Sequence, residues 1–169
     1  MVPPMTTRLC ATIGLHFIRE SCDVQPVSCG YDAVMETVTR HVQLDLTPDA
    51  LWAAITDRDT LEAWLGERVD VDLRPGGAGV IIDNGVAREV VVQSVEEGRG
   101  WTFEWRVEDA PASTVSFEIA TTDDGDSVLT ITETMEGAGA QAQASVSSLR
   151  WELCAILLWA CTAAVALVR

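Results

Sequence analysis

The chain has 169 residues, of which 48% are hydrophobic and six are proline, a composition that excludes wholesale disorder and suits one domain with its own core. The chain has eleven arginines and 26 aspartates and glutamates, which gives a formal net charge of −15. A surface this acidic repels phosphate backbones and anionic lipids. We therefore expect neither nucleic-acid binding nor a membrane-surface role.

The cysteine pattern does not predict a disulfide framework. The five cysteines are Cys10, Cys22, Cys29, Cys154 and Cys161. Their number is odd and their spacing is loose, and the last two are two turns apart on one predicted helix, too far for a bridge. The first twenty residues also lack the apolar run and cleavage pattern of a secretory signal. These features predict reduced thiols and a cytoplasmic protein.

Residues 1–36 show neither strand nor helix periodicity, and we expect a loosely ordered N-terminal extension, with Met35 as a candidate initiator. A zinc site is the alternative, because three cysteines and His16 fall in this stretch. It would lack the close cysteine pair typical of structural zinc sites. The predicted domain therefore spans residues 37–169, and we expect no cofactor and no metal in it.

Secondary structure is predicted from Thr37 onward. Residues 38–46 alternate apolar and polar side chains, which indicates a strand with one buried face. Thr47-Pro48-Asp49 then predicts a helix start: a capping hydroxyl, proline in the first turn and an acid near the helix dipole. A second short helix is predicted to begin at Asp59 or Thr60 and to end at Gly66.

Residues 69–135 contain one predicted strand after another, separated by glycine-rich turns such as Asp83-Asn84-Gly85. The strand 101–107 alternates most clearly, with Trp101, Phe103 and Trp105 on one face. The next strands place Phe117 and Ile131 on the same buried face, and Glu133 falls in the inward register of Ile131.

Residues 145–169 are predicted to form a long terminal helix, rich in alanine and leucine and free of glycine and proline. Apolar residues recur on it at steps of three and four, at Val146, Leu149, Leu153, Ile156, Ala160, Ala163 and Leu167. Trp151, Leu158 and Val165 form a second stripe. The apolar run is short for a bilayer span, and the polar positions lack the basic residues of an interfacial helix. We therefore expect a core helix covering a large apolar sheet.

These elements predict an α+β fold of the helix-grip type: a curved antiparallel sheet of about six to seven strands, two short helices and one long C-terminal helix. A curved sheet that wraps a long helix leaves room for a cavity between them. We expect that cavity to be lined by nine residues: Trp101, Phe103, Trp105, Phe117, Ile131, Glu133, Trp151, Cys154 and Leu158.

Three segments also resemble a known superfamily: VTRHVQLDLTPDALWAAITDRDTLEAWLG, VDVDLRPGGAGVI and WTFEWRVE. They are similar to the SRPBCC (START-like, helix-grip) superfamily, and most of all to the branch named after the C-terminal domain of the activator of the ninety-kilodalton heat-shock chaperone ATPase. The matching residues are Pro48, Trp52, Thr56, Asp57, Trp64, Leu73, Pro75, Gly76, Gly77, Phe103 and Trp105. The resemblance implies the fold; its members include lipid binders, cyclases, hydrolases and co-chaperone modules, so it leaves the function open.

The domain offers few candidates for catalysis. Its single histidine, His41, is predicted to face solvent, and Cys154 and Cys161 are expected to be inert core thiols. Arg40 shares the inward register of its strand and could pair with Glu133 inside the cavity; the alternative is that both side chains reach solvent.

We therefore expect a non-enzymatic domain that binds a small hydrophobic or amphipathic ligand between helix and sheet. A co-chaperone-like or regulatory protein-interaction module, with a protein partner or homodimer through the terminal helix, is the first alternative. A cyclase- or hydrolase-type enzyme is the second.

Overall fold

The computed structural model describes residues 34–123 and 125–166. They form one seven-stranded sheet and three helices. In chain order these are β1 (Met35–Leu44), α1 (Pro48–Ala54), α2 (Arg58–Trp64), β2 (Arg68–Val71), β3 (Ala78–Asp83), β4 (Val86–Glu96), β5 (Gly100–Arg106), β6 (Ser113–Thr121), β7 (Ser127–Glu136) and α3 (Ala140–Ala166).

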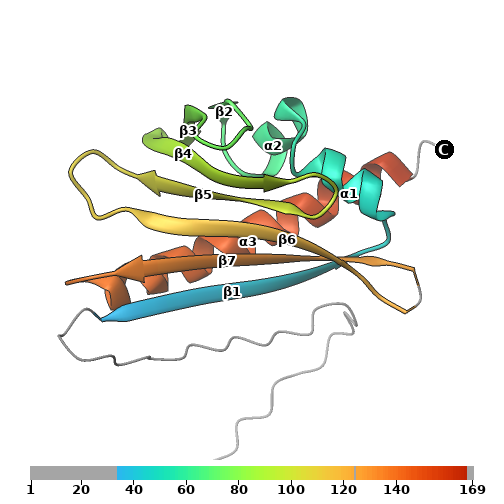
Figure 1. Ribbon diagram of the computed structural model, residues 1–169. Helices are drawn as coiled ribbons and strands as arrows, with labels where there is room; N and C mark the ends of the chain where they lie inside the picture. Colours follow the sequence, from blue (N-terminus) through green and yellow to red (C-terminus); the bar gives the residue numbers. More distant parts are fainter. Residues whose placement is uncertain (1–33, 124, 167–169) are drawn as a thin grey trace, which may run out of the picture.

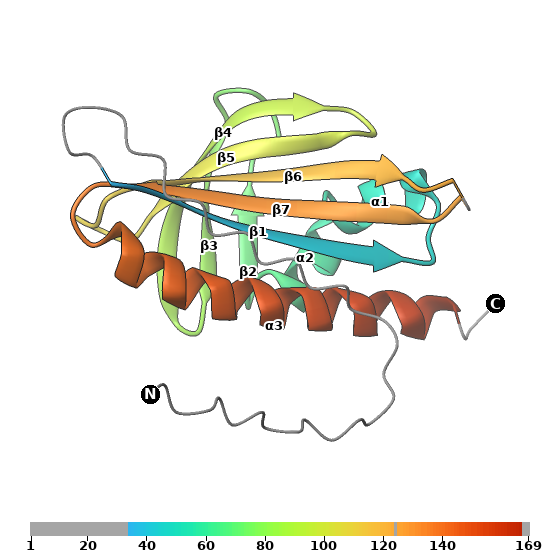
Figure 2. The same ribbon diagram turned by 90° about the horizontal axis from the view of Figure 1, so that it is seen from below.

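The sheet is antiparallel throughout, with the strand order β1-β7-β6-β5-β4-β3-β2. Figure 1 shows the first and last strands of the chain, β1 and β7, side by side. The sheet bends so that β2 and β3 turn toward the helix, and α3 runs along its concave face (Figure 2). The predicted α+β helix-grip fold, with two short helices and one long C-terminal helix, is confirmed.

Two boundaries differ from the sequence prediction. The first strand begins at Met35, two residues before Thr37, and its Glu36 side chain is buried against the fold. The second helix begins at Arg58 because Asp57 caps it: the carboxylate accepts a hydrogen bond of 3.0 Å from the backbone N–H of Thr60. This backbone bond is the main reason that the pKa of Asp57 lies below its ordinary value. The predicted Thr47 cap of the first helix is confirmed.

An aromatic cluster fills the space between the sheet and α3. The Trp101 and Phe103 rings are stacked with their centroids 4.5 Å apart, and Trp105 is stacked on Trp151 of the helix at 5.6 Å. Phe117 touches both sides at T-shaped angles. Such aromatic contacts add to the burial of large apolar surface. The predicted inward face of β5 is therefore confirmed.

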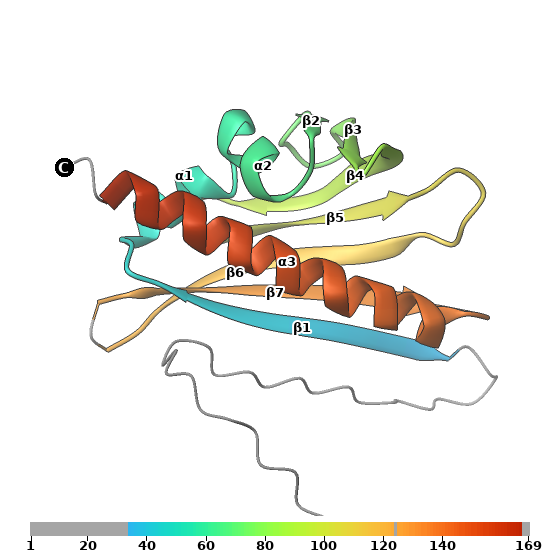
Figure 3. The ribbon, with the colours of Figure 1, turned by 180° about the vertical axis from the view of Figure 1, so that it is seen from behind.

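The orientation of α3 agrees with the prediction that Trp151, Cys154 and Leu158 face the sheet, but it leaves the other predicted apolar stripe uncovered. Trp151 and Leu158, from the second predicted stripe, face the sheet and are completely buried, together with Ala140, Ala144, Ser147 and Cys154. The first predicted stripe faces away: Val146, Leu149, Leu153 and Ile156 are 47–63% exposed. The helix is thus a core helix along one face only. Figure 3 shows this outer side of α3, with nothing described lying over it.

The length and composition of α3 would also allow it to cross a membrane: its segment Ala140–Ala163 has a mean hydropathy of 1.2. It is the one such helix among the described residues. Residues 1–33 lie outside the described residues, so the predicted N-terminal extension and the zinc alternative are not tested there. Leu167 and the side chain of Val165 are also outside them.

Candidate binding sites

The nine predicted cavity residues do lie together between α3 and the sheet. Each of them is at most 6% exposed. Two hollows, of about 160 and 80 Å³, occur in the described structure, and neither lies among these nine residues except for a contribution from Trp105. That these residues line a ligand cavity therefore stays a prediction, and in this structure their side chains pack against one another.

Glu133, from β7, lies at the centre of a buried polar network. Its carboxylate accepts hydrogen bonds from the indole N–H of Trp151 at 2.8 Å and of Trp105 at 3.0 Å, and from the hydroxyl of Ser113. The side chain is 1% exposed, so solvent does not share in these bonds. A buried carboxylate is tolerated when such donors satisfy its oxygens.

Two arginines approach the same network from opposite elements. The guanidinium carbon of Arg88, on β4, lies 4.7 Å from the centre of a Trp105 ring, and that of Arg150, on α3, lies at 5.0 Å. Arg150 also reaches Asp83 at 3.4 Å and Glu133 at 3.9 Å. Burial lowers the pKa of Arg88, and the neighbouring positive charge of Arg150 lowers it further.

Some polar atoms of this region have no partner. Arg88 Nε, Arg150 Nη1 and Ser147 Oγ are buried and make no hydrogen bond within the described chain. Donors of this kind are costly to bury, and they mark places where a further acceptor would be stabilised.

The sequence analysis missed Arg88, Arg150 and Ser113. Two of them carried a usable signal: Arg88 shares the inward register of Val90 and Val92, and Ser113 shares that of Val115 and Phe117. For Arg150, next to Trp151 on a helix that is apolar nearly all round, the sequence contained no comparable signal.

Arg40 does not pair with Glu133, which was one of the two possibilities for these side chains. Arg40 donates to the hydroxyl oxygen of Ser148 at 2.6 Å, which ties β1 to α3. Glu133 does not reach solvent either, since the donors of β5, β6 and α3 enclose it. The alternative in which both side chains reach solvent therefore fails for Glu133.

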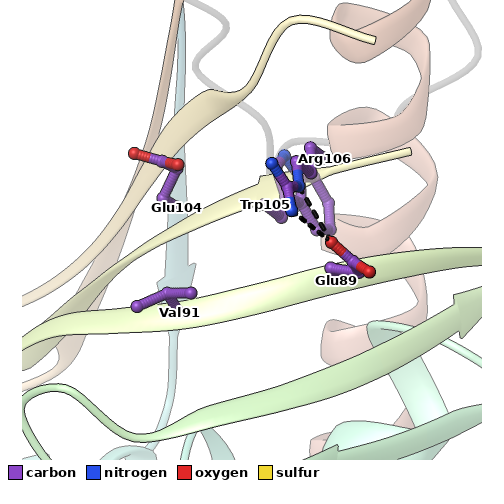
Figure 4. Close-up of a pocket in the computed structure, with 5 residues that line it drawn as sticks. All are labelled: Glu89, Val91, Glu104, Trp105 and Arg106. Atoms are coloured by element: carbon purple, nitrogen blue, oxygen red, sulfur yellow. Dashed lines mark hydrogen bonds and ion pairs between the residues drawn. The ribbon is translucent and has the colours of Figure 1, made fainter. Parts of the chain in front are cut away.

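The larger hollow lies on the outer face of the sheet, as Figure 4 shows. It is lined by Glu89, Val91, Glu104, Trp105 and Arg106. Arg106 forms a cross-strand ion pair with Glu89 at 2.7 Å. The hydrogen bond that Arg106 donates to the Glu89 carboxylate is also the main cause of the raised pKa of Arg106. Glu89 and Arg106 thus satisfy each other across this hollow.

The groups considered for catalysis are not assembled into a site. His41 is exposed and its ring bonds the Thr130 hydroxyl at 3.0 Å. Burial raises the pKa of the Cys154 thiol to about 12, which keeps it protonated at neutral pH. Among residues 34–123 and 125–166, no three histidine, cysteine or acidic residues lie close enough to hold a metal ion.

The outer face of α3 is the most extended apolar surface of the described chain. We call it the α3 outer face and define it by six side chains: Val146, Leu149, Leu153, Ile156, Leu157 and Trp159. Each is between 47% and 63% exposed. Glu152 is the exposed charge beside them, whereas Arg150 points to Asp83.

Known structures share this fold at low sequence identity. CalU16 from Micromonospora echinospora has a TM-score of 0.65 and 18% identity, over 82% of this chain and 81% of that one. The Aha1 dimer from Colwellia psychrerythraea has a TM-score of 0.64 and 14% identity, over 75% and 95%. DynU16, a protein of the dynemicin biosynthetic locus, has a TM-score of 0.65 and 18% identity over 72% of this chain, which spans 45% of that protein. These likenesses show the fold.

No curated protein matches the chain. A family model does: the one described as "Activator of Hsp90 ATPase homolog 1-like protein" matches residues 45–158, which run from the end of β1 to Leu158 in α3 and include the buried network. This stretch is well over half of the chain and contains most of the sheet and the inner face of α3. The chain therefore belongs to the family of proteins like the Hsp90 ATPase activator homolog 1.

Proposed function

We propose that this protein is a non-enzymatic module that acts by binding another polypeptide through the α3 outer face. One observation carries the proposal: six large apolar side chains lie about half exposed along one side of a single helix. Monomeric soluble proteins rarely leave an apolar patch of this extent free unless it is a binding surface.

The polypeptide should present an apolar helix or groove, because the α3 outer face is long, narrow and almost uncharged. Helix-in-groove and helix-on-helix recognition both use side chains spaced by three and four residues, as these are. A regulatory role of the kind that the family description names would be exercised through such a contact and would need no catalytic group.

A photo-crosslinking amino acid at position 153, introduced in the host cell, tests this proposal. We expect a covalent adduct with a polypeptide, identified by mass spectrometry. The matched control carries the same amino acid at position 91, where Val91 is similarly exposed on the opposite face of the sheet. Equal adducts from both positions, or none from position 153, would contradict the proposal.

A second candidate function is the binding of a small amphipathic molecule between α3 and the sheet. The observation that favours it is the pair of guanidiniums on Trp105, whose Arg88 Nε and Arg150 Nη1 are buried and donate no hydrogen bond within the described chain. An anionic head group would satisfy both donors, and its apolar part would need α3 to move outward because the interior is packed.

Native mass spectrometry of the purified chain tests the second candidate. We expect a retained anionic ligand that is lost in the Arg88→Gln variant and kept in Arg106→Gln, an exposed arginine on the outer face. Filling the interior with Cys154→Trp should also abolish retention. A mass equal to that of the bare chain would contradict this candidate and leave the α3 proposal untouched.

A further inference from the structure

The apolar side chains of the α3 outer face follow a heptad repeat. Val146, Leu149, Leu153, Ile156 and Ala160 are separated by steps of three, four, three and four residues. Steps that average three and a half residues define the a and d positions of a two-helix seam. The opposite positions, Trp151 and Leu158, face the sheet and are completely buried. The helix therefore uses one side for its own core and presents the other as a seam.

A seam of this kind is complementary to a second helix with the same spacing, and each molecule of this protein has one. We propose that the occupant of the α3 outer face is the α3 helix of a second copy of this chain, related by a twofold axis. This inference rests on the proposed function and names its partner. In a twofold contact the same surface patch serves both molecules, so no other element is needed to complete it.

The charge distribution favours a second copy at this face and nowhere else. The chain has a net charge of −15, so most of its surface repels another copy. Between Ala140 and Ala166, however, the charged residues are Arg150 and Glu152, one of each sign. Arg150 is directed toward Asp83, which leaves Glu152 at the margin of the seam. Two α3 helices can therefore meet without a row of like charges.

The same charges disfavour a membrane as the occupant. Helices that lie in a lipid interface carry lysines and arginines on their polar side, and the α3 helix has only Arg150 in its described length. A chain of net charge −15 is also repelled by anionic headgroups. Binding of the α3 outer face to neutral lipid is the remaining alternative, and the experiment below includes a test for it.

The exposed area fits a modest, concentration-dependent dimer. Six apolar side chains that are about half exposed present on the order of 500 Å² per molecule. Pairing two such faces would bury roughly 1,000 Å² in total, the lower limit for a specific interface. The dimer should therefore form at micromolar concentrations, and it should tighten when salt screens the charge repulsion between the two acidic copies.

Sedimentation equilibrium of the full chain between about 1 and 500 µM tests this inference over the range in which a small interface should dissociate. We expect a mass that rises from 18.3 kDa to twice that value, and we expect this rise at lower protein concentrations in about 0.5 M than in about 0.05 M NaCl, because the higher salt screens the charges of the two copies. Leu153→Arg and Leu153→Glu should each remain monomeric, because both place a charge in the seam. Val91→Arg, a matched change on the outer face of the sheet, should dimerise like the parent.

Mixing the two seam variants provides the sharper test. Leu153→Arg and Leu153→Glu carry opposite charges, so an equimolar mixture should recover a heterodimer that neither variant forms alone. Circular dichroism melts of each variant control for folding; Leu153 is 54% exposed, so both should fold. A parent that stays monomeric to 500 µM, a mixture that stays monomeric, or binding of the parent to neutral phosphatidylcholine vesicles in place of dimerisation would overturn the inference.

The second-copy inference and the proposed function can be tested separately. If the crosslink at position 153 yields an adduct whose mass is not twice that of the chain, the protein uses the α3 outer face for a different polypeptide. The second-copy inference then fails while the proposed function stands. If position 153 yields no adduct at all, both fail.

Discussion

The indole N–H of Trp151 donates a 2.8 Å hydrogen bond to Glu133, which joins the closing helix α3 to the middle of strand β7 through a buried carboxylate. Trp105 and Ser113 donate to the other oxygen of the same carboxylate. This arrangement fixes the rotation of α3 about its axis, because turning the helix would take the Trp151 indole donor away from the second oxygen of a buried carboxylate. The buried polar network therefore determines which side of α3 is left free.

Glu133→Gln should destabilise the fold by about 1–3 kcal/mol, since the amide replaces one accepting oxygen with an N–H₂ that faces a donor. Urea unfolding followed by tryptophan fluorescence measures the effect. Glu118→Gln, the same chemical change on an exposed position of β6, should stay within about 0.5 kcal/mol of the parent. Equal losses from the two variants would mean that the network contributes nothing specific.

Trp105→Ala should cost roughly 3–5 kcal/mol, the usual effect of removing a large aromatic side chain from a core. The loss includes the contact with Trp151 and the donor to Glu133. Thr102→Ala, on the other face of β5, should cost far less because that side chain is only partly buried. Thermal melts of both variants compare them, and similar shifts would contradict the inward phase of β5.

A chain that starts at Met35 should melt cooperatively within a few degrees of the full-length protein. It keeps every pair of the β1–β7 ladder, from Met35 opposite Glu136 to Leu44 opposite Ser127. A chain that starts at Thr39 loses four of these pairs and should melt at a clearly lower temperature. Calorimetry distinguishes the two; a broad, non-cooperative transition for the Met35 chain would contradict the predicted domain boundary.

Cys154 should react with iodoacetamide at pH 8 much more slowly than Cys161, because burial raises the pKa of the Cys154 thiol to about 12 from its ordinary value of 9.0. The folded state then holds this proton between pH 9 and 12 while the unfolded chain releases it. Stability should therefore fall as the pH rises through this interval. Peptide mapping of the alkylated protein measures the first effect.

The alkaline fall in stability can be assigned with a variant. In Cys154→Ala the group is absent, so the decline in unfolding free energy between pH 9 and 12 should be shallower than in the parent. Parallel curves for the two proteins would show that other groups cause the decline and that the thiol is accessible to solvent in the folded state.

The sheet could be predicted from the sequence because its strands alternate. In β5 every second residue is aromatic, and this period of two allows only one register against a buried face. The short helices were located by their caps; the second was predicted to begin at Asp59 or Thr60 and begins at Arg58, because Asp57 is the capping residue.

The side of α3 that faces the sheet was predicted through Trp151, Cys154 and Leu158, and all three are buried. The exposure of its other apolar stripe was not predicted, because the helix is apolar on nearly all sides and periodicity alone does not say which stripe is covered. In the longer stripe, which was predicted to run from Val146 to Leu167, the side chains of Val146, Leu149, Leu153 and Ile156 are exposed. Two causes lie outside any local pattern. Ala140, Ala144 and Ser147 are small enough to bring the helix close to the sheet, and Glu133, far away in the chain, accepts the indole N–H.

The pairing of β1 with β7 has a consequence for how the protein is made. Met35 lies opposite Glu136, and the sequence between them contains every other strand. During synthesis β1 cannot pair until β7 has left the ribosome. The aromatic side of the sheet stays uncovered until α3 has also been made. Contacts between residues this distant in the chain form slowly, and the uncovered aromatic side of the sheet is prone to aggregate in the meantime. A chain truncated before α3, and so lacking the 27 residues of that helix, would therefore leave the aromatic face of the sheet uncovered.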